Sequence, residues 1–203
     1  MREFSYDSDL IGGSLLVRES RVVAELLLEN ADEGEWKQAI QVENRLQKRS
    51  PATAKRQASA LKKRLSRLDQ PFWKALRDGD DELATQVAFV AALERNLLLV
   101  EFLETVVQDA FMLQAENLEQ YQWSDFLEDR SHRDLAIGDW TESSKKKMGQ
   151  VVFRILAEVG LLQSTRNLRL QHMLVRPEVK VLLEDSRRHR IKACLNVSSV
   201  NPA

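Results

Sequence analysis

Few residues of this chain have the types and spacing that catalysis requires. Its single cysteine, Cys194, follows His189 by five positions, which suggests a thiol nucleophile beside a base. The pair lies in a basic tail, however, where a structural or incidental thiol is the simpler explanation. Gly12-Gly13 precedes a predicted helix but lacks the lysine that a phosphate-binding loop needs. Neither feature predicts an active site.

The acidic residues and the histidines do not predict a metal site. Four carboxylates surround Gly79, namely Asp78, Asp80, Asp81 and Glu82. They lack the ligand spacing of a calcium loop, and acidic residues are favourable in the first turn of a helix. The three histidines (His132, His172 and His189) and one cysteine are too few for a zinc or iron site. We therefore predict that the chain is not an enzyme and holds neither a cofactor nor a metal.

Charge is sorted along the chain, although the net charge is only -1. The net charge is -6 over residues 1–44, +9 over 45–68, -12 over 69–142 and +8 over 143–203. Two basic blocks separated by acidic blocks predict a polyanionic partner, because folding alone does not require such sorting.

Both basic blocks coincide with predicted amphipathic elements, one helix over 51–68 and a helix and hairpin over 141–171. Their cations project opposite the apolar stripes, where they are accessible to a phosphate backbone. We predict double-stranded DNA as the partner. The predicted contact residues are Arg56, Lys63, Arg67, Lys146, Lys147, Gln150, Arg154, Arg166 and Arg169. Few of them can reach base edges, so we expect weak sequence preference.

Composition predicts a mainly α fold. The 203 residues are 43% hydrophobic and 6% aromatic, with 7 glycines and 4 prolines, which is poor material for a β-sandwich. Helical periodicity predicts helices over 15–28, 33–48, 51–68 and 71–78, and a pair over 81–114 that meets near Asn96. Ser50-Pro51 is a typical helix start. We predict a helical N-terminal domain over residues 12–120.

The pattern changes in the second part, for which we predict a domain over residues 121–190. Ser124 and Thr141 are expected to cap two helices, the second with an apolar stripe from Met148 to Val159. Residues 161–171 then predict a short β-hairpin, and Pro177 begins a final helix to about residue 188. Two helices, a hairpin and a closing helix together predict a winged-helix-like domain.

Nothing in the sequence predicts membrane association. The longest apolar run, Val87–Leu93, has seven residues, and the first seven residues lack the apolar region of a signal peptide. We therefore expect a cytoplasmic location and no membrane partner.

Several stretches resemble a known family in the same order along the chain. They are Glu19-Ser20-Arg21, Trp36-Lys37-Gln38-Ala39-Ile40, residues 43–51 (ENRLQKRSP) and residues 149–158 (GQVVFRILAE). The sequence resembles the BrxA family, small proteins of bacterial BREX phage-defence systems, from about Gly12 to Leu183. The resemblance implies an all-helical, two-part DNA-binding protein without known catalysis, which acts beside the methyltransferase and ATPases of the system.

Two alternatives stay open. The resemblance also implies that the first domain is similar to NusB, a helical RNA-binding factor, so RNA is a possible ligand. An assembly module, whose basic faces dock acidic surfaces of other BREX proteins, is the second alternative. Competition between DNA and RNA distinguishes DNA binding from the RNA-binding alternative. Whether the purified protein alone binds DNA distinguishes it from the assembly module.

Overall fold

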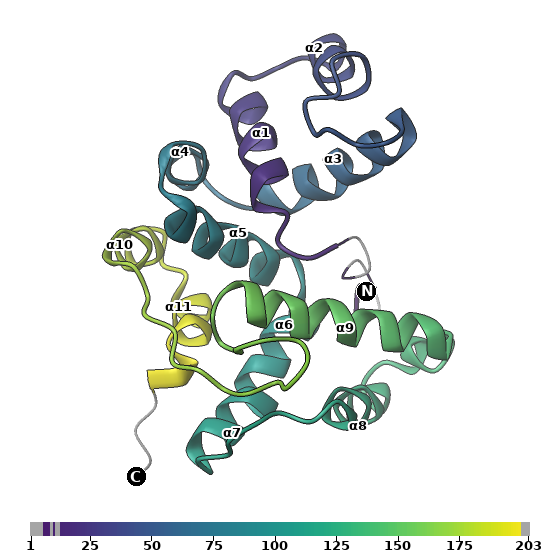
Figure 1. Cartoon of the computed structure of the whole chain (residues 1–203), viewed down its shortest axis with the longest axis vertical. Helices are drawn as coiled ribbons and strands as arrows, with labels where there is room; N and C mark the ends of the chain where they lie inside the picture. The colour runs from purple at the N-terminus through teal and green to yellow at the C-terminus, as the bar shows by residue number, and fades with distance from the viewer. Residues whose placement is uncertain (1–5, 9, 11–12, 200–203) are drawn as a thin grey trace. The chain divides into compact units, whose positions relative to one another are not determined.

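The computed structural model describes residues 6–8, 10 and 13–199, which form helices joined by mostly short connections (Figure 1). No strand is present among these residues, which contain only two isolated β-bridges. The prediction of a mainly α protein is therefore confirmed.

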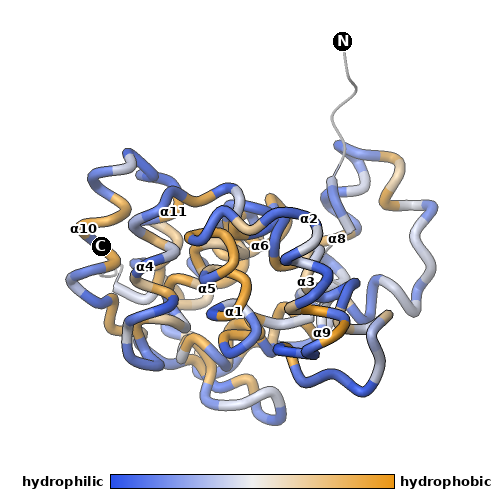
Figure 2. The backbone as a smooth tube through the Cα atoms, turned by 90° about the horizontal axis from the view of Figure 1, so that it is seen from above, coloured by the Kyte–Doolittle hydropathy of each residue, from blue (hydrophilic) through white to orange (hydrophobic). Residues whose placement is uncertain are grey.

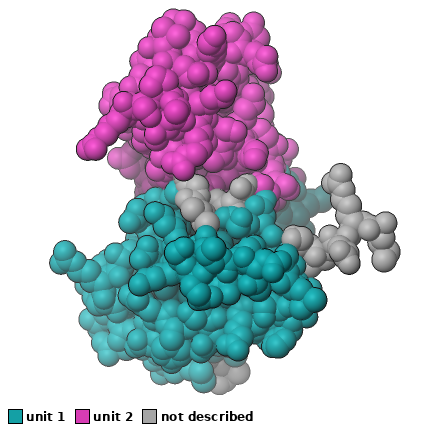
Figure 3. All heavy atoms as spheres, turned by 90° about the vertical axis from the view of Figure 1, so that its right-hand side faces the viewer, with its two compact units in different colours: residues 1–14, 96–175, 186–203 teal, residues 15–95, 176–185 magenta. Residues whose placement is uncertain are grey.

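The chain divides into two compact units, which Figure 3 colours separately. Unit 1 consists of the described parts of 1–14, 96–175 and 186–203, and unit 2 consists of 15–95 and 176–185. Each unit therefore combines segments that are distant in sequence. The division into 12–120 and 121–190 stays a prediction, because compactness does not test which segments fold independently.

Unit 2 contains six α-helices and one π-helical segment. They are α1 (Val17–Leu28), α2 (Glu33–Lys37), η2 (Gln38–Val42), α3 (Pro51–Leu65), α4 (Gln70–Asp78), α5 (Asp81–Arg95) and α10 (Pro177–Asp185). The predicted start of α3 is confirmed, because the Ser50 hydroxyl accepts the backbone N–H of Thr53 at 3.2 Å. The helix predicted over 33–48 instead ends at Val42 after its π-helical turn.

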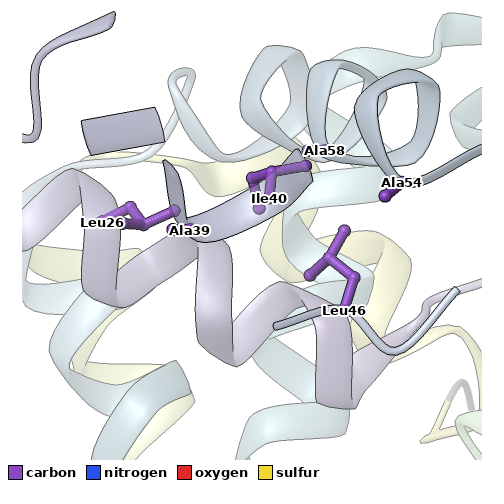
Figure 4. Close-up of a cluster of buried hydrophobic side chains, with 6 residues drawn as sticks. All are labelled: Leu26, Ala39, Ile40, Leu46, Ala54 and Ala58. Carbon is purple, nitrogen blue, oxygen red and sulfur yellow. The ribbon is translucent and has the colours of Figure 1, made fainter. Parts of the chain in front are cut away.

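The core of unit 2 lies around α5, in which ten of fifteen residues are buried. α1 packs against α3, α4 and α5. The apolar residues of these helices stand out in the hydropathy colouring of Figure 2. A smaller cluster joins the end of α1 to η2 and α3 through Leu26, Ala39, Ile40, Leu46, Ala54 and Ala58 (Figure 4).

Unit 1 contains α6 (Leu97–Phe102), η3 (Leu103–Val107, π-helical), α7 (Gln108–Met112), α8 (Tyr121–Ser131), η4 (Leu135–Ile137, a 3-10 turn), α9 (Glu142–Glu158), α11 (His189–Leu195) and η5 (Val197–Ser199, a 3-10 turn). The predicted start at Thr141 is confirmed, since its hydroxyl accepts the N–H of Ser144 at 3.2 Å. Asn96 caps α6 in the same way through the N–H of Leu99. By contrast, Ser124 lies inside α8 rather than at its start.

Aromatic side chains form the core of unit 1. Phe102 makes edge contacts with Trp123 and Phe126 of α8 at centroid distances of 5.3 Å, and with Phe153 of α9 at 6.1 Å. Because all four side chains are at most 6% exposed, this cluster joins α6, α8 and α9 into one core.

A buried carboxylate adds a polar contact to this core. Glu101, 6% exposed, accepts from Arg130 Nε at 2.5 Å and from Arg133 at 3.2 Å. The Tyr6 hydroxyl donates to the same carboxylate at 2.8 Å, and its backbone N–H donates to Asp134. Burial and the neighbouring Glu101 raise the pKa of Tyr6 to about 12. Glu101 thus holds residue 6 and the end of α8 in unit 1, with its own charge compensated.

The predicted β-hairpin, and with it the winged-helix-like domain, is wrong. Residues 161–171 form no strand: one isolated bridge joins Leu162 to Leu170, and Arg169 bridges instead to Asn117. The Ser164 hydroxyl accepts the backbone N–H groups of Arg166 and Asn167, which closes a local turn. Leu168 follows with a left-handed φ of 49°. These local bonds and this backbone conformation interrupt the regular pairing that strands need.

The end of the chain also differs from the prediction. The helix beginning at Pro177 ends at Asp185, and a further helix, α11, follows within the expected basic tail. Its apolar residues Ile191, Cys194 and Leu195 are buried. Their spacing of three and four residues is a helical signal that the surrounding cations obscured.

No single helix in the described part of the chain is long and apolar enough to cross a membrane. The segments Asp81–Arg95 and Leu97–Met112 meet that measure of length and composition only when they are taken together.

The buried stripe of α9 predicts the effect of a charge inside it. Ile155 is fully buried, so Ile155→Asp places a carboxylate in an apolar core without a partner. We expect the free energy of unfolding to fall by more than about 3 kcal/mol. Denaturant unfolding measures this change. Gln150→Asp, on the exposed face of the same helix, is the matched control and should change stability by about 0.5 kcal/mol or less. Equal effects of the two substitutions would contradict the assignment of faces.

Candidate nucleic-acid interface

The acidic residues around Gly79 form helix caps and ion pairs within unit 2. Asp80 accepts the N–H of Leu83 at 2.8 Å, which caps α5, and pairs with Arg176 at 2.9 Å; these bonds lower the pKa of its carboxyl. Asp81 pairs with Arg21 at 3.1 Å. No group of three potential ligands suited to a metal ion is present among the described residues. Asp80 and Asp81 therefore accept from a backbone N–H at the start of α5 and from arginines. Acidic residues are favourable at this end of a helix.

Cys194 is not placed for nucleophilic chemistry. It is 2% exposed in α11, and burial raises the pKa of its thiol to about 12. A thiolate is therefore strongly disfavoured at neutral pH. The prediction that this cysteine is structural or incidental agrees with its position in the core of unit 1.

Helix α9 presents one buried and one cationic face. Met148, Val152 and Ile155 are fully buried, and the helix ends where Gly160 adopts a φ of 85°. The N–H of Leu161 then bonds the Leu156 carbonyl at 2.9 Å, which closes the last turn. The opposite face exposes four predicted contact residues, Lys146, Lys147, Gln150 and Arg154.

A close approach of α8 fixes the orientation of α9. A Cβ atom at Gly149 would lie 2.5 Å from Cδ1 of Trp123, so only glycine fits there without displacement of the indole. The indole N–H also donates to the Lys145 carbonyl at 2.9 Å. Trp123 therefore bonds the backbone of α9 and packs against it at the same level, which sets the direction of the cationic face.

A groove of about 1090 Å³ lies along α8 and α9. Trp123, Leu127 and Phe153, all buried, contribute to its apolar lining. Its polar lining includes Lys146, Gln150 and Arg154 of α9, together with Glu128 of α8 and Glu142. Three of the predicted contact residues thus share one concave surface, which the sequence did not predict.

The two arginines of the predicted hairpin, Arg166 at its tip and Arg169 in its second arm, have different surroundings. Arg166, in the turn closed by Ser164, is exposed and lines a smaller hollow beside Tyr121. Arg169 pairs with Glu116 at 3.4 Å, and both side chains are more than half exposed. An exposed pair of this kind is weak, so Arg169 remains able to exchange its partner for a phosphate.

The cations of the exposed α9 face have no carboxylate partner. No acidic residue occurs between Glu142 and Glu158, and no described residue forms an ion pair with Lys146, Lys147, Arg154 or Arg166. In the same unit Lys145 pairs with Glu142 at 2.9 Å, and Arg190 pairs with Glu104 at 2.6 Å. Unit 1 therefore contains a local excess of positive charge at the groove.

The remaining predicted contact residues lie in unit 2. Arg56 and Lys63 are exposed on α3, and Arg67 is exposed just beyond its last turn. The Lys62 Nζ atom lies 4.2 Å from the centroid of the Trp36 ring, and Arg64 is only 7% exposed. These two cations therefore contribute to the packing of unit 2. The structure thus distributes the predicted residues over two basic surfaces, one in each unit.

Comparison with known sequences identifies the family. The sequence model of the BrxA family matches residues 5–187, which is most of the chain. The chain belongs to the BrxA family. The resemblance found in the sequence is therefore confirmed, and the matched range includes α3, α8, α9 and the groove.

Curated BrxA relatives cover nearly the same length. The chain is 39% identical to "BREX protein BrxA" of Paramagnetospirillum magneticum (strain ATCC 700264 / AMB-1), over 98% of this chain and 100% of the relative. It is 36% identical to "BREX protein BrxA" of Escherichia coli O9:H4 (strain HS), over 87% and 83%. The crystal structure of an uncharacterized protein from Magnetospirillum magneticum is similar at a TM-score of 0.88 and 36% identity. That similarity covers 95% of this chain and 99% of the other.

The stretches that carry the BrxA resemblance in unit 2 are structural. Glu19 pairs with Lys48, and the buried Ser20 hydroxyl donates to the Leu15 carbonyl at 3.2 Å. Arg21 donates to the carbonyls of Leu76, Arg77 and Gly79 at 2.8–3.1 Å, which caps the end of α4. These contacts support the packing of α1.

Sequence reasoning missed two residues of the groove. Gly149 is a glycine inside a strong helical pattern, which often marks a close approach and was a usable signal. Tyr121, 61% exposed, lines both the groove and the hollow beside Arg166. Its position depends on the tertiary arrangement, so no local pattern indicated it.

The approach at Gly149 predicts that alanine is destabilising there, although alanine is the better helix former by about 1 kcal/mol. The Cβ must displace the packed Trp123 ring, an overpacking that costs about 1–3 kcal/mol. We expect Gly149→Ala to lower the melting temperature by a few degrees in calorimetry. Gln150→Ala, one residue along on the exposed face, serves as control and should leave it unchanged. A raised melting temperature for Gly149→Ala would contradict the close approach.

Proposed function

We propose that this BrxA-family chain is a non-enzymatic, double-stranded DNA-binding component of a bacterial BREX phage-defence system. The observation that carries the proposal is the cationic face of α9, where Lys146, Lys147 and Arg154 are exposed without a carboxylate partner. Neighbouring like charges on a helix oppose its folding slightly. A polyanion compensates them, and DNA is a polyanion with closely spaced charges.

The proposed contacts are mainly with phosphates. Lysine and arginine bind phosphate oxygens without reading sequence, and Gln150 and Arg154 are the α9 side chains best suited to base edges. Because no hairpin wing is formed, we do not derive a docking geometry in the major groove. We propose weak sequence preference, with Arg166 and Arg169 adding contacts beside α9 and with Arg56, Lys63 and Arg67 forming a second contact surface.

The BREX role rests on family membership and on the names of the relatives, which are BREX proteins. Other BREX proteins are the proposed protein partners, and the cytoplasm is the proposed location. The absence of catalysis is part of the proposal. It is supported by the buried thiol of Cys194 and by the ion pairs that occupy the Asp80 cluster.

Competition distinguishes DNA from the other candidates. Labelled duplex DNA is displaced with duplex DNA, duplex RNA or single-stranded RNA of equal length, each at the same salt concentration. We expect unlabelled duplex DNA to displace the labelled DNA at a lower concentration than either RNA. Stronger displacement by RNA would favour the RNA-binding alternative, and no shift of DNA by the purified protein would favour the assembly module.

The segregated charge predicts a strong salt dependence of DNA binding. If about five phosphates are neutralised, log affinity should fall against log salt concentration with a slope of roughly -4 to -5. A DNA titration by fluorescence anisotropy at several salt concentrations measures this slope. A slope near zero, or no binding at low salt, would refute the proposal.

The two basic surfaces should differ in importance. Reversal of Lys146, Lys147 and Arg154 to glutamate should weaken DNA binding more than reversal of Arg56, Lys63 and Arg67. The reason is that Lys146 and Arg154 of α9 line a groove, whereas the α3 cations contribute mainly a long-range positive potential. Equilibrium affinity at one fixed salt concentration decides the order.

Stability and a single-charge control accompany this comparison. All six residues are exposed, so each substitution should change stability by under about 0.5 kcal/mol. Lys180→Glu on α10, also exposed and outside both sets, reports the effect of one charge reversal. A larger loss for the α3 variant would place the DNA on unit 2 instead.

A further inference from the structure

The shape of the groove differs from what a duplex alone requires. Phosphates of a duplex can be bound by a convex cationic helix face, yet the cations of α9 border a hollow of about 1090 Å³. That volume slightly exceeds the ~300–1,000 Å³ typical of small-molecule sites. Its floor includes the apolar faces of Trp123, Leu127 and Phe153, which phosphates do not need.

An exposed aromatic side chain stands beside the same cations. Tyr121 begins α8, is 61% exposed, and lines the groove together with Gln150 and Arg154. It also lines the neighbouring hollow with Arg166. Tyrosine among arginines is the combination with which single-stranded nucleic acids are bound, because bases stack on the ring and phosphates pair with the cations.

We propose that the α8–α9 groove takes an unpaired base of DNA, with Tyr121 as its stacking residue. The inference rests on the proposed DNA binding and names the form of DNA that this surface prefers, a duplex with a single-stranded end. Bases inside a duplex are stacked and paired, so they cannot enter the groove without the cost of unpairing. An overhang supplies the base without that cost.

The charges of the groove favour a base over other occupants. Lys146 and Arg154 meet the phosphates that flank the base, and Gln150 offers both a donor and an acceptor to a base edge. Glu128 lines the same groove, and Glu142 is held by Lys145. A carboxylate repels a phosphate or an acidic peptide but can accept from an amino group of a base. An acidic protein segment is therefore the less suitable occupant.

The test compares a blunt duplex with the same duplex carrying a short single-stranded overhang, using the full chain and fluorescence anisotropy. We expect tighter binding of the overhang. Tyr121→Ala should weaken overhang binding by between roughly fivefold and 150-fold, the equivalent of about 1–3 kcal/mol for one stacked base. It should leave blunt-duplex affinity within about twofold, since stacking plays no part there. A fluorescent adenine analogue in the overhang should be quenched by the wild-type chain and not by Tyr121→Ala.

Three variants control the interpretation. Tyr121→Phe retains the ring and should behave as wild type. Leu135→Ala removes an 84% exposed apolar side chain that does not line the groove, and should change neither substrate. Ser124→Leu, at an exposed position of α8 that lines the groove, adds bulk without an aromatic ring and should weaken the preference for the overhang while blunt-duplex binding is retained.

The outcomes separate this proposal from the DNA-binding proposal. Equal, salt-dependent binding of blunt and overhang duplexes, unchanged in Tyr121→Ala, would overturn the groove assignment alone and would leave the groove to a protein segment. No binding of either duplex would overturn both proposals.

Discussion

Trp123 fixes the arrangement on which the rest of unit 1 depends. Its ring meets Phe102 and Phe126 in the core, its N–H bonds the Lys145 carbonyl, and its face occupies the space that a side chain at Gly149 would need. Aromatic packing is directional, and the hydrogen bond adds a second constraint at the same level of α9. With α9 held in this way, its apolar residues are buried and its lysines must face solvent. Trp123 and Gly149 also line the groove between α8 and α9.

Charge compensation in this protein is selective. Buried or half-buried arginines satisfy carboxylates that close structural elements, as Arg130 does for Glu101 and Arg21 for Asp81. Lys146, Lys147 and Arg154 form no such pair with a described residue, and α9 contains no acidic residue between Glu142, which pairs with Lys145, and Glu158. A net charge of -1 therefore conceals a strongly uneven surface. Within a Debye length of about 8 Å, a ligand meets this local charge rather than the net charge of the chain.

The predictable parts of the structure are those governed by local chemistry. Ser50, Asn96 and Thr141 cap helices as their side chains dictate, and the apolar stripe of α9 is buried as its period requires. The hairpin could not be judged in this way. Residues 168–171 (LRLQ) alternate as a strand would, yet Ser164 bonds the backbone and Leu168 has a left-handed conformation. The exposed cations were predicted correctly as exposed residues. The groove was not predictable, since it arises from the contact between Trp123 and Gly149 across two helices.

Loss of the hairpin changes what the surface beside α9 can do. A protruding β-hairpin would carry Arg166 and Arg169 away from the helix, along the backbone of a bound duplex. The short turn instead places Arg166 at the hollow that Tyr121 also lines, while the exposed Arg169–Glu116 pair lies next to the connection before α8. Cations, an exposed ring and apolar side chains therefore line the groove and the hollow beside it. The cations can pair with the phosphates of a duplex, whereas the apolar lining gains contact only with ligand groups that enter the groove. In DNA, the groups that are planar, apolar on their faces and polar at their edges are the bases.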